Sequence, residues 1–194
     1  MQLVTANNLG YSINEKRLFH NLTFSLNYGS GLHIKGGNGS GKSTLLRIIL
    51  GLTSPSKGSV EYCKPNLQVS YLGHKNAIKH YLTPIQNLEL IFGSSALQNA
   101  MKWMNTLGLN NVQDELTANL SFGQQKKLAL IRIFASESDL IVLDEPFVGL
   151  DNATRDLLSN FLKEKVLDGA SLILTSHIEP LIDCDVLELG GYNA

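Results

Sequence analysis

The stretch GGNGSGKS at residues 36–43 sets four glycines among eight positions and ends on a lysine and a hydroxyl residue. Ordering glycine costs more backbone entropy than ordering other residues, so the stretch must meet a need that only glycine serves. Glycines let the backbone curl tightly, and the N–H groups of the curl then point inward, toward phosphate oxygens. The spacing matches a phosphate-binding loop, which lies between a strand and a helix. The sequence therefore predicts an α/β fold, although an ordinary glycine-rich surface turn is the alternative.

The residues around the loop supply a strand, a helix and the necessary charge. Leu32 to Lys35 reads as a strand, and Thr44 to Leu52 carries apolar residues at helical spacing. A helix that begins here adds the positive end of its dipole. We expect Lys42 to bind the β- and γ-phosphates and the Ser43 hydroxyl to ligate Mg²⁺, which prefers oxygen. The predicted nucleotide-binding residues of the loop are Gly36, Asn38, Gly39, Ser40, Gly41, Lys42, Ser43 and Thr44.

Two acidic residues follow a second apolar segment. Leu140 to Leu143 is short, apolar and branched, which is typical of a buried parallel strand, and Asp144 and Glu145 come directly after it. The ends of such strands face the ligand crevice. We therefore expect Asp144 to reach the metal, often through water, and Glu145 to orient or deprotonate the attacking water.

A second helix start with anion-binding character lies at residues 120–125. Ser121 is a plausible N-cap, and the flexible Gly123 lies beside it. An ordinary helix cap would explain this pattern. The phosphate loop is already a complete site, however, so a second anion-binding helix start has a use if it faces the nucleotide held by another copy.

The order of the expected elements indicates the architecture. Strands alternate with helices along most of the chain, which predicts a mainly parallel core sheet. Residues 3–35 read as short, more antiparallel strands, and residues 76–135 read as a helical insertion. We expect a single domain over residues 1–194 that contains both subdomains. No apolar run approaches the roughly 20 residues of a membrane span. The net charge of −1 gives no reason to expect nucleic acid as a partner.

These motifs, followed by Thr175-Ser176-His177, resemble in their order the ATP-binding subunits of ABC transporters. The similarity covers about residues 3–190, with Phe122 in place of a glycine that most members of the family have. The resemblance implies an ATPase with a P-loop NTPase fold that uses ATP and Mg²⁺. It also implies a homodimer, or a pair with a second nucleotide-binding domain. In that pair ATP is held between the loop of one copy and residues 121–124 of the other.

The same resemblance assigns roles to individual residues. It implies that Tyr11 stacks on adenine, that His177 contacts the γ-phosphate, and that Asp151 communicates across the dimer. His74 stands where most members have a glutamine that senses Mg²⁺ and the γ-phosphate. Imidazole is a poor ligand for a hard ion, so we expect a water-mediated contact or a contact with a membrane subunit, with a simple loop residue as the alternative. The expected sites outside the loop are therefore catalytic Glu145 and His177, metal-binding Asp144, and nucleotide-binding Tyr11, His74, Ser121, Gly123, Gln124 and Asp151.

A narrower resemblance rests on several short segments. The segments are Leu72-Gly73-His74, Ile78-Lys79, Leu82-Thr83, Asn87-Leu88, Gln124 to Lys127 and Glu145-Pro146-Phe147. They are similar to segments of the haem-exporter ATPases of cytochrome c biogenesis. This resemblance implies a peripheral subunit on the cytoplasmic face of the inner membrane, with polytopic membrane partners of the CcmB and CcmC kind. In that family ATP drives haem loading through release of a haem-carrying chaperone.

Three other functions stay open from the sequence. The ATP-binding subunit of a different ABC transporter would share the main motifs. A soluble ABC-type ATPase of translation or DNA metabolism usually carries two nucleotide domains or long coiled or basic extensions, and neither is visible here. An unrelated P-loop GTPase or kinase would leave the second anion site unused, and the guanine-reading NKxD motif is absent from the sequence.

Overall fold

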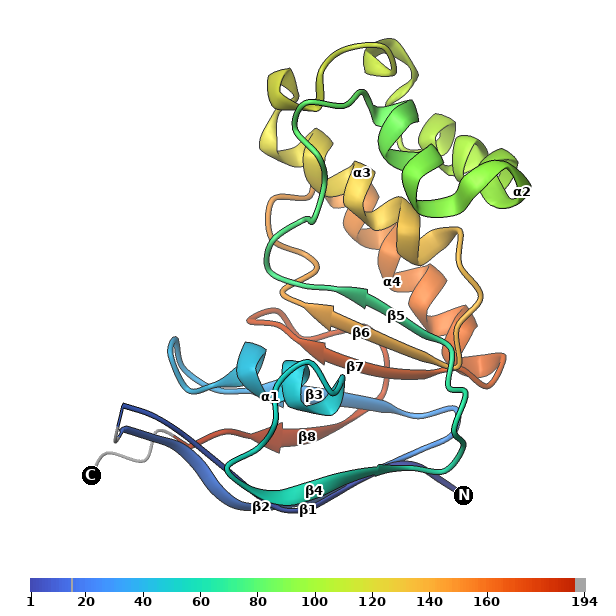
Figure 1. Ribbon diagram of the computed structural model, residues 1–194. Helices are drawn as coiled ribbons and strands as arrows, with labels where there is room; N and C mark the ends of the chain where they lie inside the picture. The colour runs from blue at the N-terminus through green and yellow to red at the C-terminus, as the bar shows by residue number, and fades with distance from the viewer. Residues whose placement is uncertain (15, 191–194) are drawn as a thin grey trace.

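The computed structural model describes residues 1–14 and 16–190 and is built around a five-stranded sheet (Figure 1). The strand order is β5-β6-β7-β3-β8, and every neighbouring pair is parallel. The predicted parallel core is therefore confirmed. Its strands are β3 (Gly31–Lys35), β5 (Val69–Leu72), β6 (Leu140–Asp144), β7 (Ser171–Thr175) and β8 (Cys184–Glu188).

An antiparallel sheet lies beneath this core in Figure 1, and two of its strands precede the core in the chain. It contains β1 (Gln2–Ile13), β2 (Lys16–Asn27) and β4 (Lys57–Tyr62) in the order β2-β1-β4. The expectation of short strands was wrong, because β1 and β2 each span 12 residues. Register shifts interrupt their pairing, for example between Ala6 and Leu9. Such bulges break the two-residue alternation by which a long strand is recognised in a sequence.

Most of the helices lie on the other side of the parallel sheet. The span α2 (Pro84–Thr106) contains non-helical backbone at Gly93 (φ 60°, ψ −168°), so it consists of two helical stretches joined by a kink. The 3-10 turns η1 (Asn110–Val112) and η2 (Thr117–Asn119) connect α2 to α3. The helices are α1 (Lys42–Ile49), α2 (Pro84–Thr106), α3 (Phe122–Phe134) and α4 (Asn152–Leu167).

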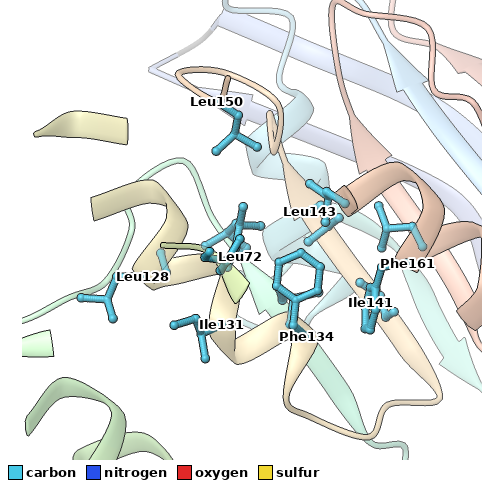
Figure 2. Close-up of a cluster of buried hydrophobic side chains, with 14 of the residues drawn as sticks. Leu72, Leu128, Ile131, Phe134, Ile141, Leu143, Leu150 and Phe161 are labelled. Atoms are coloured by element: carbon cyan, nitrogen blue, oxygen red, sulfur yellow. The ribbon is translucent and has the colours of Figure 1, made fainter. Parts of the chain in front are cut away.

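Two apolar clusters cover the two faces of the parallel sheet. Alternate residues of β6 belong to the two clusters. Leu140 and Val142 join the cluster with α1 and the antiparallel sheet. Ile141 and Leu143 join the cluster with α2, α3 and α4, which Figure 2 shows. Strands buried on both faces read as continuous apolar runs, as β6 does.

Aromatic stacking fixes α3 within the second cluster. The ring of Phe134 on α3 lies 4.5 Å from that of Trp103 on α2 and 4.8 Å from that of Phe161 on α4, measured between ring centres. The helix α3 is thus held between two other helices and the sheet. None of the helices described here combines the length and the apolarity needed to cross a membrane.

Candidate nucleotide-binding site

The loops after β3, β5, β6 and β7 meet at the carboxyl edge of the parallel sheet and form a cleft of about 520 Å³. Crevices at this edge are where open α/β sheets bind ligands. The cleft contains most of the predicted loop, the two acidic residues and both predicted histidines. Its lining residues are Ile13, Leu18, Asn38, Gly39, Ser40, Gly41, Lys42, Ser43, Thr44, His74, Asp144, Glu145, Val148 and His177.

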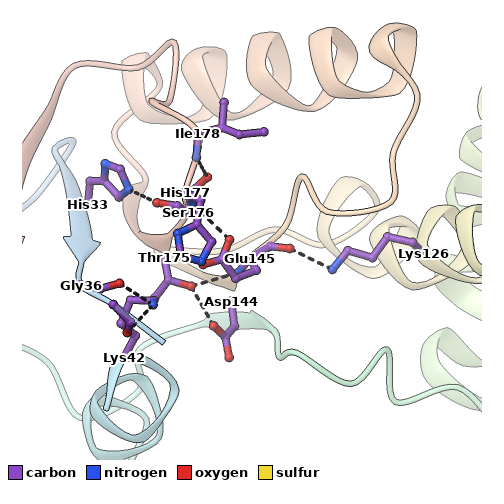
Figure 3. A network of polar contacts seen from close by, with 11 residues as sticks. His33, Gly36, Lys42, Lys126, Asp144, Glu145, Thr175, Ser176, His177 and Ile178 are labelled. Carbon is purple, nitrogen blue, oxygen red and sulfur yellow. Dashed lines mark hydrogen bonds and ion pairs between the residues drawn. The ribbon is translucent and has the colours of Figure 1, made fainter. Parts of the chain in front are cut away.

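The glycine loop curls tightly between β3 and α1. Gly36 has φ +154°, and a Cβ there would lie 2.6 Å from the Ser40 hydroxyl oxygen and 2.8 Å from the Leu189 carbonyl oxygen. The helix α1 begins at Lys42, and no side chain caps its first N–H groups. These N–H groups are thus open to an anion. The Lys42 ammonium donates to the carbonyl oxygens of Gly36 (2.8 Å) and Gly37 (3.3 Å), so the cation lies over its own loop (Figure 3).

Asp144 ends β6 inside the cleft and is only 2% exposed. Its Oδ1 atom accepts a hydrogen bond of 2.7 Å from the Thr175 hydroxyl. Its Oδ2 atom is buried and has no hydrogen-bond partner among the described residues. An unpaired buried carboxylate oxygen is costly unless something else binds it. A divalent cation or its bound water fits this position, with the Ser43 hydroxyl in the same cleft as a second oxygen ligand.

No group of three histidine, cysteine or acidic side chains that could hold a metal occurs in the described chain. Mg²⁺ is usually held by one or two protein oxygens together with water and substrate phosphates. The unpaired Asp144 oxygen and the Ser43 hydroxyl supply such oxygens and fit a magnesium ion that arrives with a nucleotide.

Glu145 has a left-handed backbone (φ 48°), which is strained for a residue with a side chain. Its N–H points at Thr175, 3.0 Å from the hydroxyl oxygen and 3.2 Å from the carbonyl oxygen. Its carboxylate accepts a 3.3 Å hydrogen bond from the N–H of His177, and the Nε2 atom of His177 lies 3.5 Å from Oε1. The two residues predicted to be catalytic are therefore in direct contact.

Two buried side chains that the sequence analysis did not select also hold these loops. The His33 ring on β3 makes a 2.9 Å hydrogen bond through Nε2 to the carbonyl oxygen of Ser176, next to His177. The Lys126 ammonium on α3 donates to the Glu145 carbonyl oxygen at 3.3 Å. A lone histidine in a strand and a lysine in a helix are common in any sequence. Only the structure reveals their partners.

Tyr11 is not brought to this cleft. It stacks on Phe19, with ring centres 6.3 Å apart, and lines a separate hollow with Arg17 and Lys57. From the antiparallel sheet, Ile13 and Leu18 line the nucleotide cleft instead. The sequence analysis did not select these two side chains.

The residues of the second predicted anion site lie at the start of α3 and do not line the cleft. Ser121 and Gln124 form a capping box: each accepts a hydrogen bond from the backbone of the other, at 3.3 Å and 2.8 Å. Gly123 lies beside them, and Phe122 is 60% exposed. The Gln124 side chain is thus bound to the first turn of its own helix. Within this single chain it does not contact the cleft.

Asp151 also lies outside the cleft, at the start of α4. Its carboxylate caps α4 by accepting from the Thr154 N–H at 2.8 Å, and it pairs with Lys127 at 2.7 Å. The hydrogen bond from Lys127 and then that from Thr154 hold the pKa of Asp151 well below its usual range. The side chain therefore stays ionised and joins α3 to α4.

Comparison with known families agrees with this geometry. Residues 19–148 match the model of the ABC transporter family. The chain is 40% identical over 174 residues to the cytochrome c biogenesis ATP-binding export protein CcmA of Idiomarina loihiensis, an alignment that covers 82% of this chain and 78% of that protein. It is 34% identical over 198 residues to the protein of the same name from Rickettsia felis, covering 96% and 100%.

Solved structures share the fold. An ATP-binding subunit of an ABC transporter superposes with a TM-score of 0.78 at 24% identity, over 91% of this chain and 80% of that one. An ATP-binding cassette in a dimeric post-hydrolysis state, bound to ADP and Pi, also gives 0.78 at 24% identity, over 91% and 88%. The predicted P-loop NTPase architecture is confirmed, and the chain belongs to the ABC transporter family of ATP-binding proteins and, within it, to the CcmA-type cytochrome c biogenesis ATP-binding export proteins.

Proposed function

We propose that this chain hydrolyses ATP in the cleft described above, as the motor subunit of a cytochrome c biogenesis export complex. The observation that carries the proposal is the cleft itself. It joins the phosphate loop, the unpaired oxygen of Asp144 and the Glu145–His177 pair at one edge of the sheet. The relatives' names place them in cytochrome c biogenesis and export, which is the pathway that we infer for this chain.

The residues of the cleft have distinct roles in the proposed reaction. Lys42 and the N–H groups at the start of α1 bind the phosphates. Ser43 and Asp144 are the residues that would hold Mg²⁺, which would neutralise phosphate charge. Glu145 orients the attacking water and accepts its proton. The water oxygen bonds to the γ-phosphorus, the bond to the bridging oxygen breaks, and ADP leaves with that oxygen. His177 holds the Glu145 carboxylate and lies where it can contact the γ-phosphate.

We infer that Ile13 and Leu18 take the place beside the base that was expected for Tyr11. Both are apolar and belong to the antiparallel sheet at the edge of the cleft. Apolar side chains can cover the face of a base without hydrogen bonds, which leaves the phosphates to supply most of the binding energy.

We also infer a head-to-tail dimer in which α3 of one copy completes the cleft of the other. The start of α3 carries the anion-binding potential of a helix N-terminus, yet it does not line its own cleft. Ser121 and Gly123 are available for this contact at the surface of the chain. The cassette described as dimeric with ADP and Pi shares the fold.

The membrane subunits would dock near the start of α2. Tyr81 is 72% exposed and Leu116 is 49% exposed, and we call this pair the apical patch. The two loops that bear them are joined by backbone hydrogen bonds, from Thr117 to Leu82 and from Ala118 to His80. The chain from His74 in the cleft to Tyr81 is one short loop. We therefore infer that it transmits the state of the nucleotide to the membrane partner on the cytoplasmic face.

Glu145→Gln tests the proposed chemistry. The amide cannot accept the proton, so ATP turnover should fall by roughly 10²–10⁴-fold, while ATP affinity stays within about twofold. Trapped ATP should also convert the variant from monomer to dimer in gel filtration. Glu164→Gln, at an exposed position of α4, is the matched control and should behave as the unaltered protein. Full turnover in Glu145→Gln would contradict the proposed base, and a monomer with ATP would contradict the dimer.

A further inference from the structure

Lys126 is a buried charged side chain that the proposed chemistry does not use. It lies on α3 and is only 3% exposed. Lysine is almost never this deeply buried unless it is paired. In the described part of the chain no carboxylate lies within ion-pair distance, and its ammonium donates to the backbone carbonyl oxygen of Glu145 at 3.3 Å. Burial lowers the pKa of Lys126, and the charges of Asp144 and Glu145 oppose that shift.

The partner of this lysine is a peptide with a strained backbone. Glu145 has a left-handed backbone, so its conformation persists only if the surroundings hold it. From one side, Thr175 on β7 binds its N–H; from the other, Lys126 binds its carbonyl. Figure 3 shows Lys126 reaching this carbonyl from the side opposite to His177 and Lys42. The direction in which the Glu145 side chain leaves the backbone therefore depends on the position of α3.

The helix links this contact rigidly to its own first turn. Lys126 lies five residues after Ser121, which is about 7.5 Å along a helix. The next residue, Lys127, binds Asp151 at 2.7 Å, and Gln125 donates to the carbonyls of Thr117 and Leu120. The side chains of Gln125, Lys126 and Lys127 thus attach α3 to the loops on either side of it. Of these three, Lys126 is the one that binds the peptide of the predicted base.

We propose that Lys126 is a positioning residue that ties the orientation of Glu145 to the placement of α3. This inference rests on the proposed head-to-tail dimer. There the start of α3 binds the nucleotide of the partner copy, so a shift of α3 on binding moves the Lys126 ammonium and with it the Glu145 peptide. ATP in one composite site then sets the geometry of the base in the other. Lys126 makes hydrolysis at the two sites cooperative without contacting either nucleotide.

Lys126→Met removes the donor and keeps the length and packing of the side chain. Replacing a buried charge by an apolar side chain is often neutral for stability, so the variant should fold. The Glu145 carbonyl then loses its partner, and a base displaced by about 1 Å can slow a reaction about 100-fold. We expect kcat to fall about 10- to 100-fold, ATP affinity to stay within about twofold, and the Hill coefficient for ATP hydrolysis to drop to about one. Lys102→Met, exposed on α2, is the matched control.

A second variant separates positioning from structure. Lys126→Arg keeps a cationic donor and should recover most of kcat and the cooperativity. Unchanged kcat and Hill coefficient in Lys126→Met would overturn the inference, as would equal losses in the arginine and methionine variants. A parallel loss of kcat, ATP affinity and thermal stability would show a merely structural role and overturn it as well.

Dimerisation distinguishes this inference from the function on which it rests. Lys126→Met combined with Glu145→Gln should still form the ATP-dependent dimer, because the lysine does not contact the nucleotide. If Glu145→Gln alone stays monomeric with ATP, the head-to-tail arrangement fails. If it dimerises normally and Lys126→Met retains full cooperative turnover, only the role of Lys126 fails.

Discussion

Adjacent carboxylates at the end of β6 are prepared for different tasks by their surroundings. Asp144 is buried, and the Thr175 hydroxyl fixes one of its oxygens while the other is left for a cation. Glu145, one residue further, turns into a left-handed backbone and meets His177. A single residue step along the strand end thus separates the proposed metal ligand from the proposed base.

Asp151 offers a test at the same scale. Its pKa is lowered in the folded chain, so its contribution to stability is complete above the unfolded value of about 3.9 and is lost as the pH falls through the folded value. Asp151→Asn keeps a capping oxygen but loses the charge. Because the Asp151 side chain is half exposed, we expect the substitution to lower the free energy of unfolding by only about 0.5 kcal/mol at pH 7. Urea titrations should show this difference shrinking below about pH 4.

Asp114→Asn changes an exposed aspartate elsewhere in the chain. It should leave the free energy of unfolding unaltered, both at pH 7 and below about pH 4. A difference between Asp151→Asn and the unaltered protein that stays constant from pH 7 to the lowest pH would show that charge plays no part.

At the scale of elements, α3 and the segment from Glu145 to Asp151 behave as one unit. Besides the two lysine contacts, the Phe122 ring lies over Gly149, whose φ is +79°. A Cβ at Gly149 would lie 2.3 Å from the ring. The phenylalanine that replaces a glycine at the start of α3 therefore depends on a glycine in the following loop.

Gly149→Ala should disturb this contact. A left-handed backbone costs a residue with a side chain about 1 kcal/mol, and the displaced ring adds about 1 kcal/mol more. Gly108→Ala is the control, because Gly108 also has a positive φ (+71°) but its Cβ would meet nothing within 4 Å. Denaturant unfolding should therefore show a larger loss for Gly149→Ala. In the double variant with Phe122→Ala, the loss of stability caused by Gly149→Ala should shrink to that of Gly108→Ala. An unchanged loss would show that the Phe122 ring does not contribute to the effect.

The same elements show what a sequence can and cannot predict. The glycine loop, the apolar β6 and the acids after it lie where the sequence predicted them, because each depends on residues that are neighbours in the chain. Tyr11 lies outside the cleft that was expected to hold it. The contacts of Lys126 and His33 could not be predicted, since their partners lie 19 and 143 residues away in sequence. The lengths of β1 and β2 were missed because bulges interrupt their alternation.

At the scale of the whole molecule, both apolar clusters are built on one parallel sheet, from which we propose that the chain is a single domain. The prediction of one domain over residues 1–194 includes residue 15 and residues 191–194, which lie outside the described residues. The antiparallel sheet and α1 cover one face, and α2, α3 and α4 cover the other. The cleft opens at the carboxyl edge of the parallel sheet, and the apical patch belongs to the loops before α2 and η2.

The apical patch can be tested in membranes. Replacing Tyr81 and Leu116 by serine should leave the ATPase activity of the isolated protein unchanged, because neither residue lines the cleft. Recovery of polytopic membrane subunits with the protein should fall about tenfold if the patch supplies about 1.4 kcal/mol of docking energy. Covalently haem-stained c-type cytochromes should decrease in cells that carry the variant. Leu167→Ser, exposed on α4, is the control. Unchanged recovery and staining would reject this docking surface.

The position of Lys42 bears on the shape of the loop as well as on its charge. Its ammonium donates to two carbonyl oxygens of the loop that precedes it, those of Gly36 and Gly37. The lysine therefore braces the curl from which it projects. Removing it should loosen the loop as well as delete a positive charge.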